Sequence, residues 1–94
     1  MKQVVLTQNH KIVRVLEAIH TRGTMPTYVI RNCLDWREKG REGKWLGATT
    51  PQVLRICWIA HKRGFVGLAK SSYATMKVWH MTDAGRAFLT SEVQ

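Results

Sequence analysis

The 94-residue sequence contains few acidic residues, few cysteines and no long apolar run. Six Asp and Glu stand against fifteen Lys and Arg, which gives a formal net charge of +9 at pH 7. Such an excess of basic residues favours a polyanionic partner, and nucleic acid is the commonest one. Because the basic residues are spread along the whole chain, we expect no separate basic tail.

Without a long apolar run, the chain offers no candidate for a membrane-spanning helix, which needs roughly 18 apolar residues. It also contains no separate basic amphipathic helix that would anchor it to an anionic membrane surface. The N-terminal segment MKQVVLTQNHK lacks the features of a signal peptide, so we expect a cytoplasmic protein with no membrane partner. Length and an apolar content of 45% predict one small domain, residues 1–94.

The two cysteines, Cys33 and Cys57, are too few for a disulfide framework. Each falls on the apolar side of an expected helix, so they are interpreted as buried free thiols, with a redox switch as the alternative. Cys57 and His61 share a helix face, but two ligands do not form a metal site. The segment GREGKWLG lacks the Lys-Ser/Thr ending of a phosphate-binding loop. We therefore expect no metal, no cofactor and no enzymatic activity.

The segment TTPQVLRICWIAHKRG, residues 49–64, has the signals of a single helix. Thr50 is the expected N-cap and Pro51 the first helical residue. Gly64 provides the C-terminal stop. The interior is mostly apolar, apart from a stripe at helical spacing that contains Gln52, Arg55, Ile59 and Lys62.

This stripe has two interpretations. Arginine can pair bidentately with guanine and glutamine with adenine, so exposed Gln52 and Arg55 would suit a DNA major groove. In the other interpretation, the stripe of a core helix simply faces water. We expect Leu54 and Trp58 to be buried and Arg55 to be exposed.

Three further helices and a hairpin are expected around this central helix. Hydrophobic periodicity predicts helices over residues 8–21 and 27–39, and a last helix from Asp83 with Ala84, Ala87 and Phe88 as its inner face. Phe65–Lys70 and Thr75–Met81 are rich in strand-forming residues and predict two strands. In the glycine-rich loop before the central helix, Trp45 either anchors a phosphate-binding loop or packs into the core.

The order helix, helix, helix, strand, strand, helix resembles the winged helix-turn-helix. Val53–Leu68 looks like the recognition helix of bacterial winged-helix regulators, continued into the first wing strand. Met81–Leu89 is similar to the Leu-Thr-x-x-Gly-Arg-x-x-Leu pattern of MarR-like and PadR-like regulators, with Met81 in place of the first leucine. The resemblance implies a mainly α fold with a small β-hairpin wing.

The resemblance also implies a small sequence-specific transcription regulator that binds double-stranded DNA. Helix 51–63 would enter the major groove, and the wing, residues 70–77, would lie on the DNA backbone. A homodimer is an open possibility, although the long terminal helices with which MarR-like proteins dimerise are missing. The residues implied to contact DNA are Thr49, Thr50, Gln52, Arg55, Lys62, Lys44, Lys70, Ser71, Ser72, Tyr73 and Lys77.

Two alternatives to a specific regulator stay open. In the first alternative, the chain is a winged-helix protein-interaction module, for example a phage protein that docks on a host protein. Tyr73 and Ile59 favour this reading, because aromatic and apolar anchors dominate protein interfaces. The net charge alone equally suits a non-specific nucleic-acid binder, whose affinity would depend steeply on salt.

Overall fold

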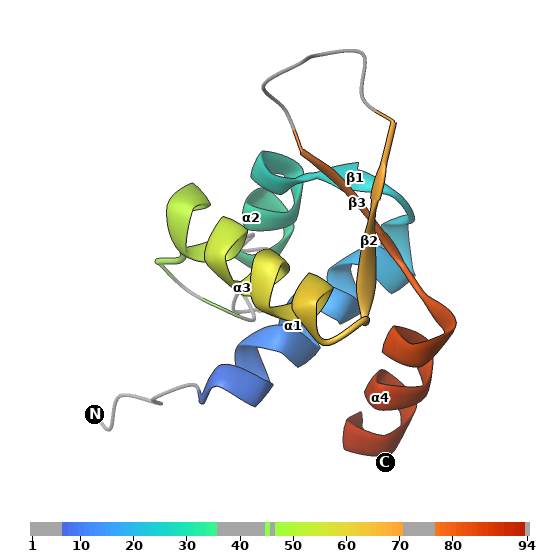
Figure 1. The fold of residues 1–94 in the computed structure, drawn as a ribbon. Coiled ribbons are helices and arrows are strands. Elements are labelled where there is room, and N and C mark those ends of the chain that lie inside the picture. Colours follow the sequence, from blue (N-terminus) through green and yellow to red (C-terminus); the bar gives the residue numbers. More distant parts are fainter. Residues whose placement is uncertain (1–6, 36–44, 46, 71–76, 94) are drawn as a thin grey trace, which may run out of the picture.

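The computed structural model describes residues 7–35, 45, 47–70 and 77–93 (Figure 1). In this part of the chain, helices dominate and a small three-stranded antiparallel sheet completes the fold. This confirms a mainly α chain with a small β component. The elements, in order, are α1 (Gln8–Arg22), β1 (Met25–Pro26), α2 (Thr27–Asp35), α3 (Thr50–Lys62), β2 (Val66–Ala69), β3 (Val78–Met81) and α4 (Asp83–Val93).

Helices α1 and α3 begin with the same capping box. The hydroxyl of Thr7 accepts the backbone N–H of His10 at the start of α1, and that of Thr49 accepts the N–H of Gln52 in α3. The prediction that Thr50 is the cap was wrong by one residue: Thr49 is extended, with φ −96° and ψ 157°, and Thr50 is already helical. Pro51 is therefore the second helical residue, where its missing N–H is equally harmless.

The sheet has the strand order β1-β3-β2, and both strand pairs are antiparallel. In the β2–β3 pair, Val66 lies opposite Met81 and Ala69 lies opposite Val78, which confirms the two predicted strands with shorter bounds. Strand β1 was missed because its two residues, one of them a proline, show no alternating pattern. It forms only because the turn between α1 and α2 lies beside β3.

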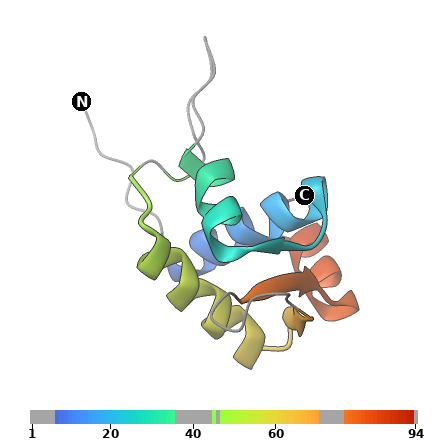
Figure 2. The ribbon, with the colours of Figure 1, turned by 90° about the horizontal axis from the view of Figure 1, so that it is seen from above.

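The core lies between α1, α2, α3 and the inner face of the sheet (Figure 2). The predicted apolar face of α1 is buried, and Trp79 of β3 is fully buried. Trp45 belongs to this core with 7% of its surface exposed, and the Lys11 ammonium lies 5.2 Å from the centroid of its ring. Of the two interpretations of Trp45, core packing is the correct one.

Helix α4 is joined to the end of the sheet by a cap and a close contact. The hydroxyl of Thr82 accepts the backbone N–H of Gly85 at 3.1 Å and so caps α4, which begins at Asp83 as predicted. Gly85 is buried, and a Cβ there would collide with the backbone carbonyl of Phe65. The predicted inner face was partly wrong, because Ala84 and Ala87 are exposed while Gly85 and Leu89 are buried.

Candidate nucleic-acid interface

Helix α3 lies at an edge of the molecule, and no other described element covers its outer side (Figures 1 and 2). Its buried residues follow helical spacing and face the core: Val53, Ile56, Cys57 and Ala60. The outer side carries exposed residues, including Pro51, Arg55 and Lys62. The predicted exposure of Arg55 is therefore confirmed.

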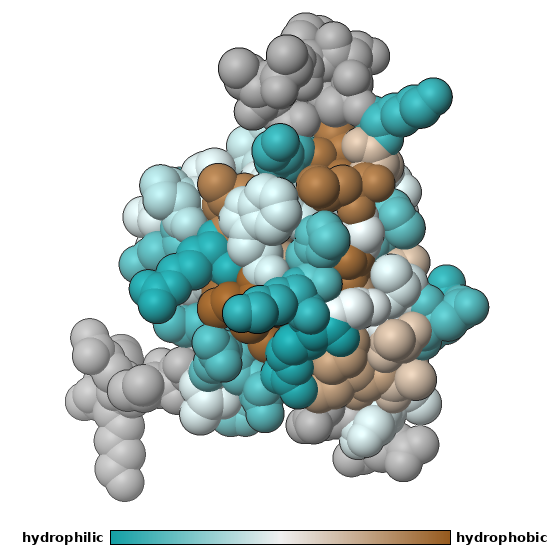
Figure 3. Space-filling model, in the orientation of Figure 1, coloured by the Kyte–Doolittle hydropathy of each residue, from teal (hydrophilic) through white to brown (hydrophobic). Residues whose placement is uncertain are grey.

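The outer side of α3 forms a shallow, largely apolar groove, here called the α3 groove. Figure 3 shows that hydrophobic patches over α3 and the strand pair alternate with hydrophilic ones. The groove is lined by Pro51, Leu54, Arg55, Trp58, Ile59 and Lys62. Two cations, Arg55 and Lys62, therefore line the groove together with four apolar residues.

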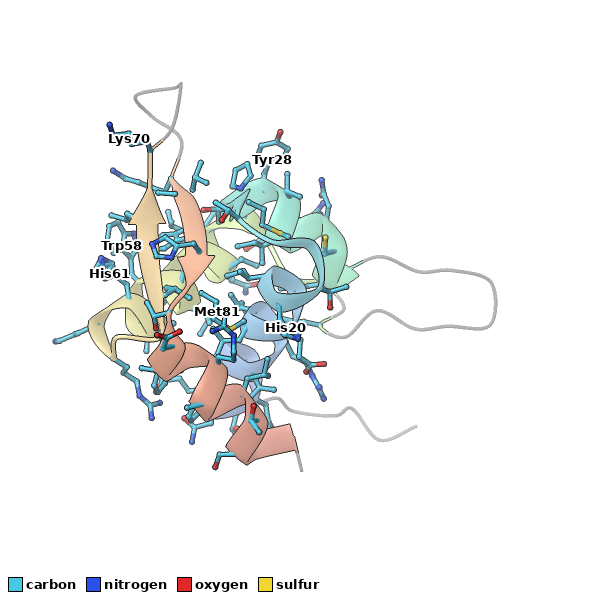
Figure 4. All side chains as sticks on the ribbon, turned by 90° about the vertical axis from the view of Figure 1, so that its right-hand side faces the viewer. His20, Tyr28, Trp58, His61, Lys70 and Met81 are labelled. Atoms are coloured by element: carbon cyan, nitrogen blue, oxygen red, sulfur yellow. The ribbon has the colours of Figure 1, made fainter. Side chains whose placement is uncertain are left out.

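Trp58 was predicted to be buried, but 41% of its surface is exposed. Its ring stacks on His61 with 5.5 Å between centroids and meets the edge of Trp79 at 5.0 Å, close to the strand pair (Figure 4). Successive helical residues are rotated by about 100°, so the buried face of α3 is centred near Val53 and Ala60, and Trp58 lies beyond its border. Leu54 is half-buried rather than buried, for the same reason.

The residues predicted to recognise bases differ in their freedom to do so. The side-chain oxygen of Gln52 accepts the backbone N–H of Thr49 at 3.1 Å, so both residues stabilise the start of α3. Thr50 is exposed next to them. Within the described residues, Arg55 and Lys62 make no hydrogen bond or ion pair and are available to a ligand.

The strand pair contributes two exposed lysines. Lys70 follows β2 and Lys77 precedes β3, so the register places both at the same end of the pair (Figure 4). The backbone carbonyl of Lys77 accepts the N–H of Thr27 at 3.3 Å, which ties this end to the start of α2. The remaining predicted DNA contacts lie outside the described residues: Lys44, Ser71, Ser72 and Tyr73.

The sequence interpretation missed two exposed apolar side chains at this surface, Trp58 and Leu68. Leu68 lies opposite Trp79 in the β2–β3 register, and 43% of its surface is exposed. No local signal distinguishes Leu68 from an inward-facing strand residue, because its exposure depends on how far the helices extend over the sheet. Both residues add apolar area to a surface that was expected to be polar.

The cysteines and ionisable groups show no second site. Both cysteines are free thiols, but only Cys57 is buried as predicted, whereas Cys33 is half-buried. Burial raises the pKa of Cys57 to about 12. Among the described residues, no three His, Cys, Asp or Glu side chains form a possible metal site, and no helix is long and apolar enough to span a membrane. In comparisons with known proteins, neither a family model nor a curated sequence matches this chain.

Proposed function

We propose that this protein is a small, sequence-specific transcription regulator of the winged-helix type that binds double-stranded DNA. Helix α3 enters the major groove, and residues 70–77 lie along the DNA backbone. One observation carries the proposal: the outer side of α3 presents Arg55 and Lys62, which make no ion pair with any residue that the structure describes, beside a strand pair that carries Lys70 and Lys77.

The dimensions of α3 suit this role. A helix with its side chains is about 10–12 Å across, and the major groove of B-DNA is about 12 Å wide. Thirteen residues extend α3 over about 20 Å, which is enough to follow the groove past several base pairs. The net charge of +9 attracts the phosphates that line both sides of the groove.

The contacts of α4 support the resemblance to MarR-like and PadR-like regulators. Three of the four matched residues of the Met81–Leu89 segment make local contacts, and the fourth, Leu89, is buried. Thr82 caps α4, Gly85 permits contact with the Phe65 carbonyl, and Arg86 pairs with Asp83 at 3.0 Å. The pattern thus explains how a helix follows the second strand, which is the connection that a winged helix requires.

A randomised duplex library tests the proposal. The protein is incubated with the library, the bound duplexes are sequenced, and their affinities are measured against salt. We expect an enriched motif, and a palindrome would indicate that a dimer binds it. With about five or six phosphate contacts, log K should fall against log salt with a slope of about −5.

The variants Arg55→Ala and Arg86→Ala provide a matched comparison, because each removes one positive charge from an exposed helix position. Loss of a bidentate contact to guanine should cost Arg55→Ala about 1–3 kcal/mol and relax the motif at one position. Arg86→Ala, on α4, should keep both the affinity and the motif. Equal behaviour of the two variants would contradict the proposed role of α3.

A protein-interaction module is the second candidate, and the exposure of Trp58 and Leu68 favours it. Large apolar side chains are enriched at the energetic centres of protein interfaces. In this case, a stoichiometric protein partner would be recovered with the chain after nuclease treatment, and Trp58→Ala would abolish its recovery. Salt-dependent DNA binding without an enriched motif would instead indicate a non-specific nucleic-acid binder.

A further inference from the structure

The contacts of Gln52 limit the bases that α3 can recognise. Bidentate recognition of adenine needs both the carbonyl oxygen and the amide group of a glutamine side chain. In this structure the Gln52 oxygen already accepts the N–H of Thr49 at 3.1 Å, and this bond completes the capping box. The bond holds the Gln52 side chain against the first turn of the helix, which disfavours the bidentate pairing with adenine that the sequence suggested.

Once Gln52 is engaged, the outer side of α3 offers mainly apolar contact. Leu54, Trp58 and Ile59 line the α3 groove, and Arg55 is the cation nearest to the start of the helix. The major-groove edges of the base pairs carry one apolar group, the C5-methyl of thymine. An apolar groove on a helix that enters the major groove therefore matches this methyl group.

The ring of Trp58 contacts two other rings, which favours one orientation for contact with a methyl group. It stacks on His61 of the same helix and meets the edge of Trp79 on β3. Trp79 is fully buried, and its indole N–H donates a hydrogen bond to the Thr27 hydroxyl at 2.8 Å. The exposed ring therefore rests on a buried and hydrogen-bonded support.

Charge favours DNA as the occupant of the groove. Arg55 and Lys62, which have no ion pair within the described part of the chain, line the groove beside its apolar residues, and the chain carries a net charge of +9. A purely apolar partner would leave both cations without counter-charges, whereas the phosphates beside the major groove supply them. The same groove thus combines apolar contact with ionic contact.

We infer that the α3 groove recognises thymine by its C5-methyl group, with Trp58 and Ile59 as the contact residues and Arg55 on a neighbouring guanine. This inference rests on the proposed function, because it requires α3 to lie in the major groove. It assigns specificity to two apolar residues instead of to Gln52.

Replacement of thymine by deoxyuridine tests the inference without any change to the protein. Deoxyuridine keeps the Watson–Crick pair and removes only the methyl group. In a duplex that carries the enriched motif, each thymine is replaced in turn, and the dissociation constant is measured at constant salt. We expect about a fourfold loss of affinity for each thymine whose methyl contacts the groove, and no loss for a thymine outside the motif.

A double-mutant cycle that combines Trp58→Ala with the deoxyuridine substitution tests whether Trp58 contacts the thymine methyl group. The deoxyuridine substitution should no longer weaken binding by this variant, because the contact is already lost. Tyr28→Ala, which removes an exposed aromatic ring from α2, should respond to deoxyuridine as the unmodified protein does. If Trp58→Ala fails to fold, as judged by circular dichroism, Ile59→Ala replaces it in the cycle.

The outcomes separate the inference from the proposed function. Sequence-specific binding that tolerates deoxyuridine at every thymine would overturn the inference and leave the proposed function intact. An absence of sequence-specific binding would overturn both. Binding that deoxyuridine weakens equally in Trp58→Ala, Ile59→Ala and the unmodified protein would overturn the assignment of the methyl contact to the α3 groove.

Discussion

The indole N–H of Trp79 donates a 2.8 Å hydrogen bond to the hydroxyl of Thr27, and this bond joins strand β3 to the first residue of α2. Both residues are buried, so neither polar group has access to water as an alternative partner. The ring of Trp79 that donates this bond also contacts the exposed ring of Trp58, with 5.0 Å between the ring centroids. The stability of the fold and the position of the candidate interface therefore depend on the same pair.

Thr27→Val should lower the free energy of unfolding by about 1–3 kcal/mol, because it leaves the buried indole N–H of Trp79 without an acceptor. Valine has nearly the shape of threonine, so the change removes the hydroxyl with little change in packing. Chemical denaturation with urea measures the loss. Thr27→Ser keeps the acceptor and should lose less stability, and the reverse order would contradict this role of the bond.

The two contacting tryptophans should differ clearly in their contributions to stability. Trp79→Ala should cost about 3–5 kcal/mol, because Trp79 is fully buried. Trp58→Ala should cost only about 1–2 kcal/mol, because its ring is partly exposed and loses mainly aromatic contacts. Thermal unfolding followed by circular dichroism compares the two. Similar losses would mean that Trp58 is more deeply buried in solution.

Gly85→Ala should destabilise the fold by about 1–3 kcal/mol, because the added methyl collides with the Phe65 carbonyl and forces α4 away from the sheet. Gly67→Ala is the matched control. The three atoms nearest to its methyl all belong to the His80 side chain, which can rotate away. Differential scanning calorimetry should therefore show a lower unfolding temperature for Gly85→Ala than for Gly67→Ala.

The stability of the fold should decrease at alkaline pH in part because of Cys57. Burial raises the pKa of this thiol to about 12 from an ordinary value of 9.0, so the folded state keeps its proton where the unfolded state loses it. The stabilisation is complete below about pH 9 and is lost as the pH rises towards 12, by at most about 1.4 kcal/mol per pH unit.

Comparison with Cys57→Ala isolates this contribution, because other groups titrate in the same range. Urea denaturation at several pH values between about 8 and 11 should give a flatter dependence for the variant. Thiol labelling of the native protein near pH 8 should modify half-buried Cys33 before Cys57. Rapid labelling of Cys57 in the folded protein would contradict its burial.

Lys70→Ala and Lys77→Ala should weaken DNA binding without changing the preferred sequence, because lysines at the end of the strand pair meet phosphates rather than bases. Each variant should make the slope of log K against log salt less steep by about 1. Fluorescence anisotropy across a salt series measures both quantities. A changed motif in either variant would place these lysines at base edges.

Much of the fold follows from local signals in the chain. The periodic apolar residues of α1, the cap at Thr7 and the glycine at position 23 define that helix without reference to the rest of the molecule. The cap at Thr82 marks the start of α4 in the same way. By contrast, β1 forms only by pairing with β3, and no pattern within Met25–Pro26 predicts a strand.

The candidate interface was harder to predict than the helix that carries it. The exposure of Arg55 was predicted correctly because a charged side chain opposite the apolar face of a helix points to solvent. Trp58 was misplaced because hydrophobicity does not determine the direction of a large ring beyond the border of that face. The hydrogen bond of Gln52 was not predicted because the cap was placed one residue too late. Gln52 completes a capping box only when Thr49 is the N-cap.

The capping box of Thr49 and Gln52 also has a consequence for how α3 meets a ligand. Two side chain–backbone bonds, at 3.1 and 3.3 Å, hold the first turn of the helix within the free chain. A turn that became ordered only on association would lose conformational entropy at that moment, about 1–2 kcal/mol for each residue. Because α3 has already lost this entropy during folding, its partner meets a preorganised surface. The free energy of the contacts then does not have to offset the ordering of the helix, and the affinity is higher.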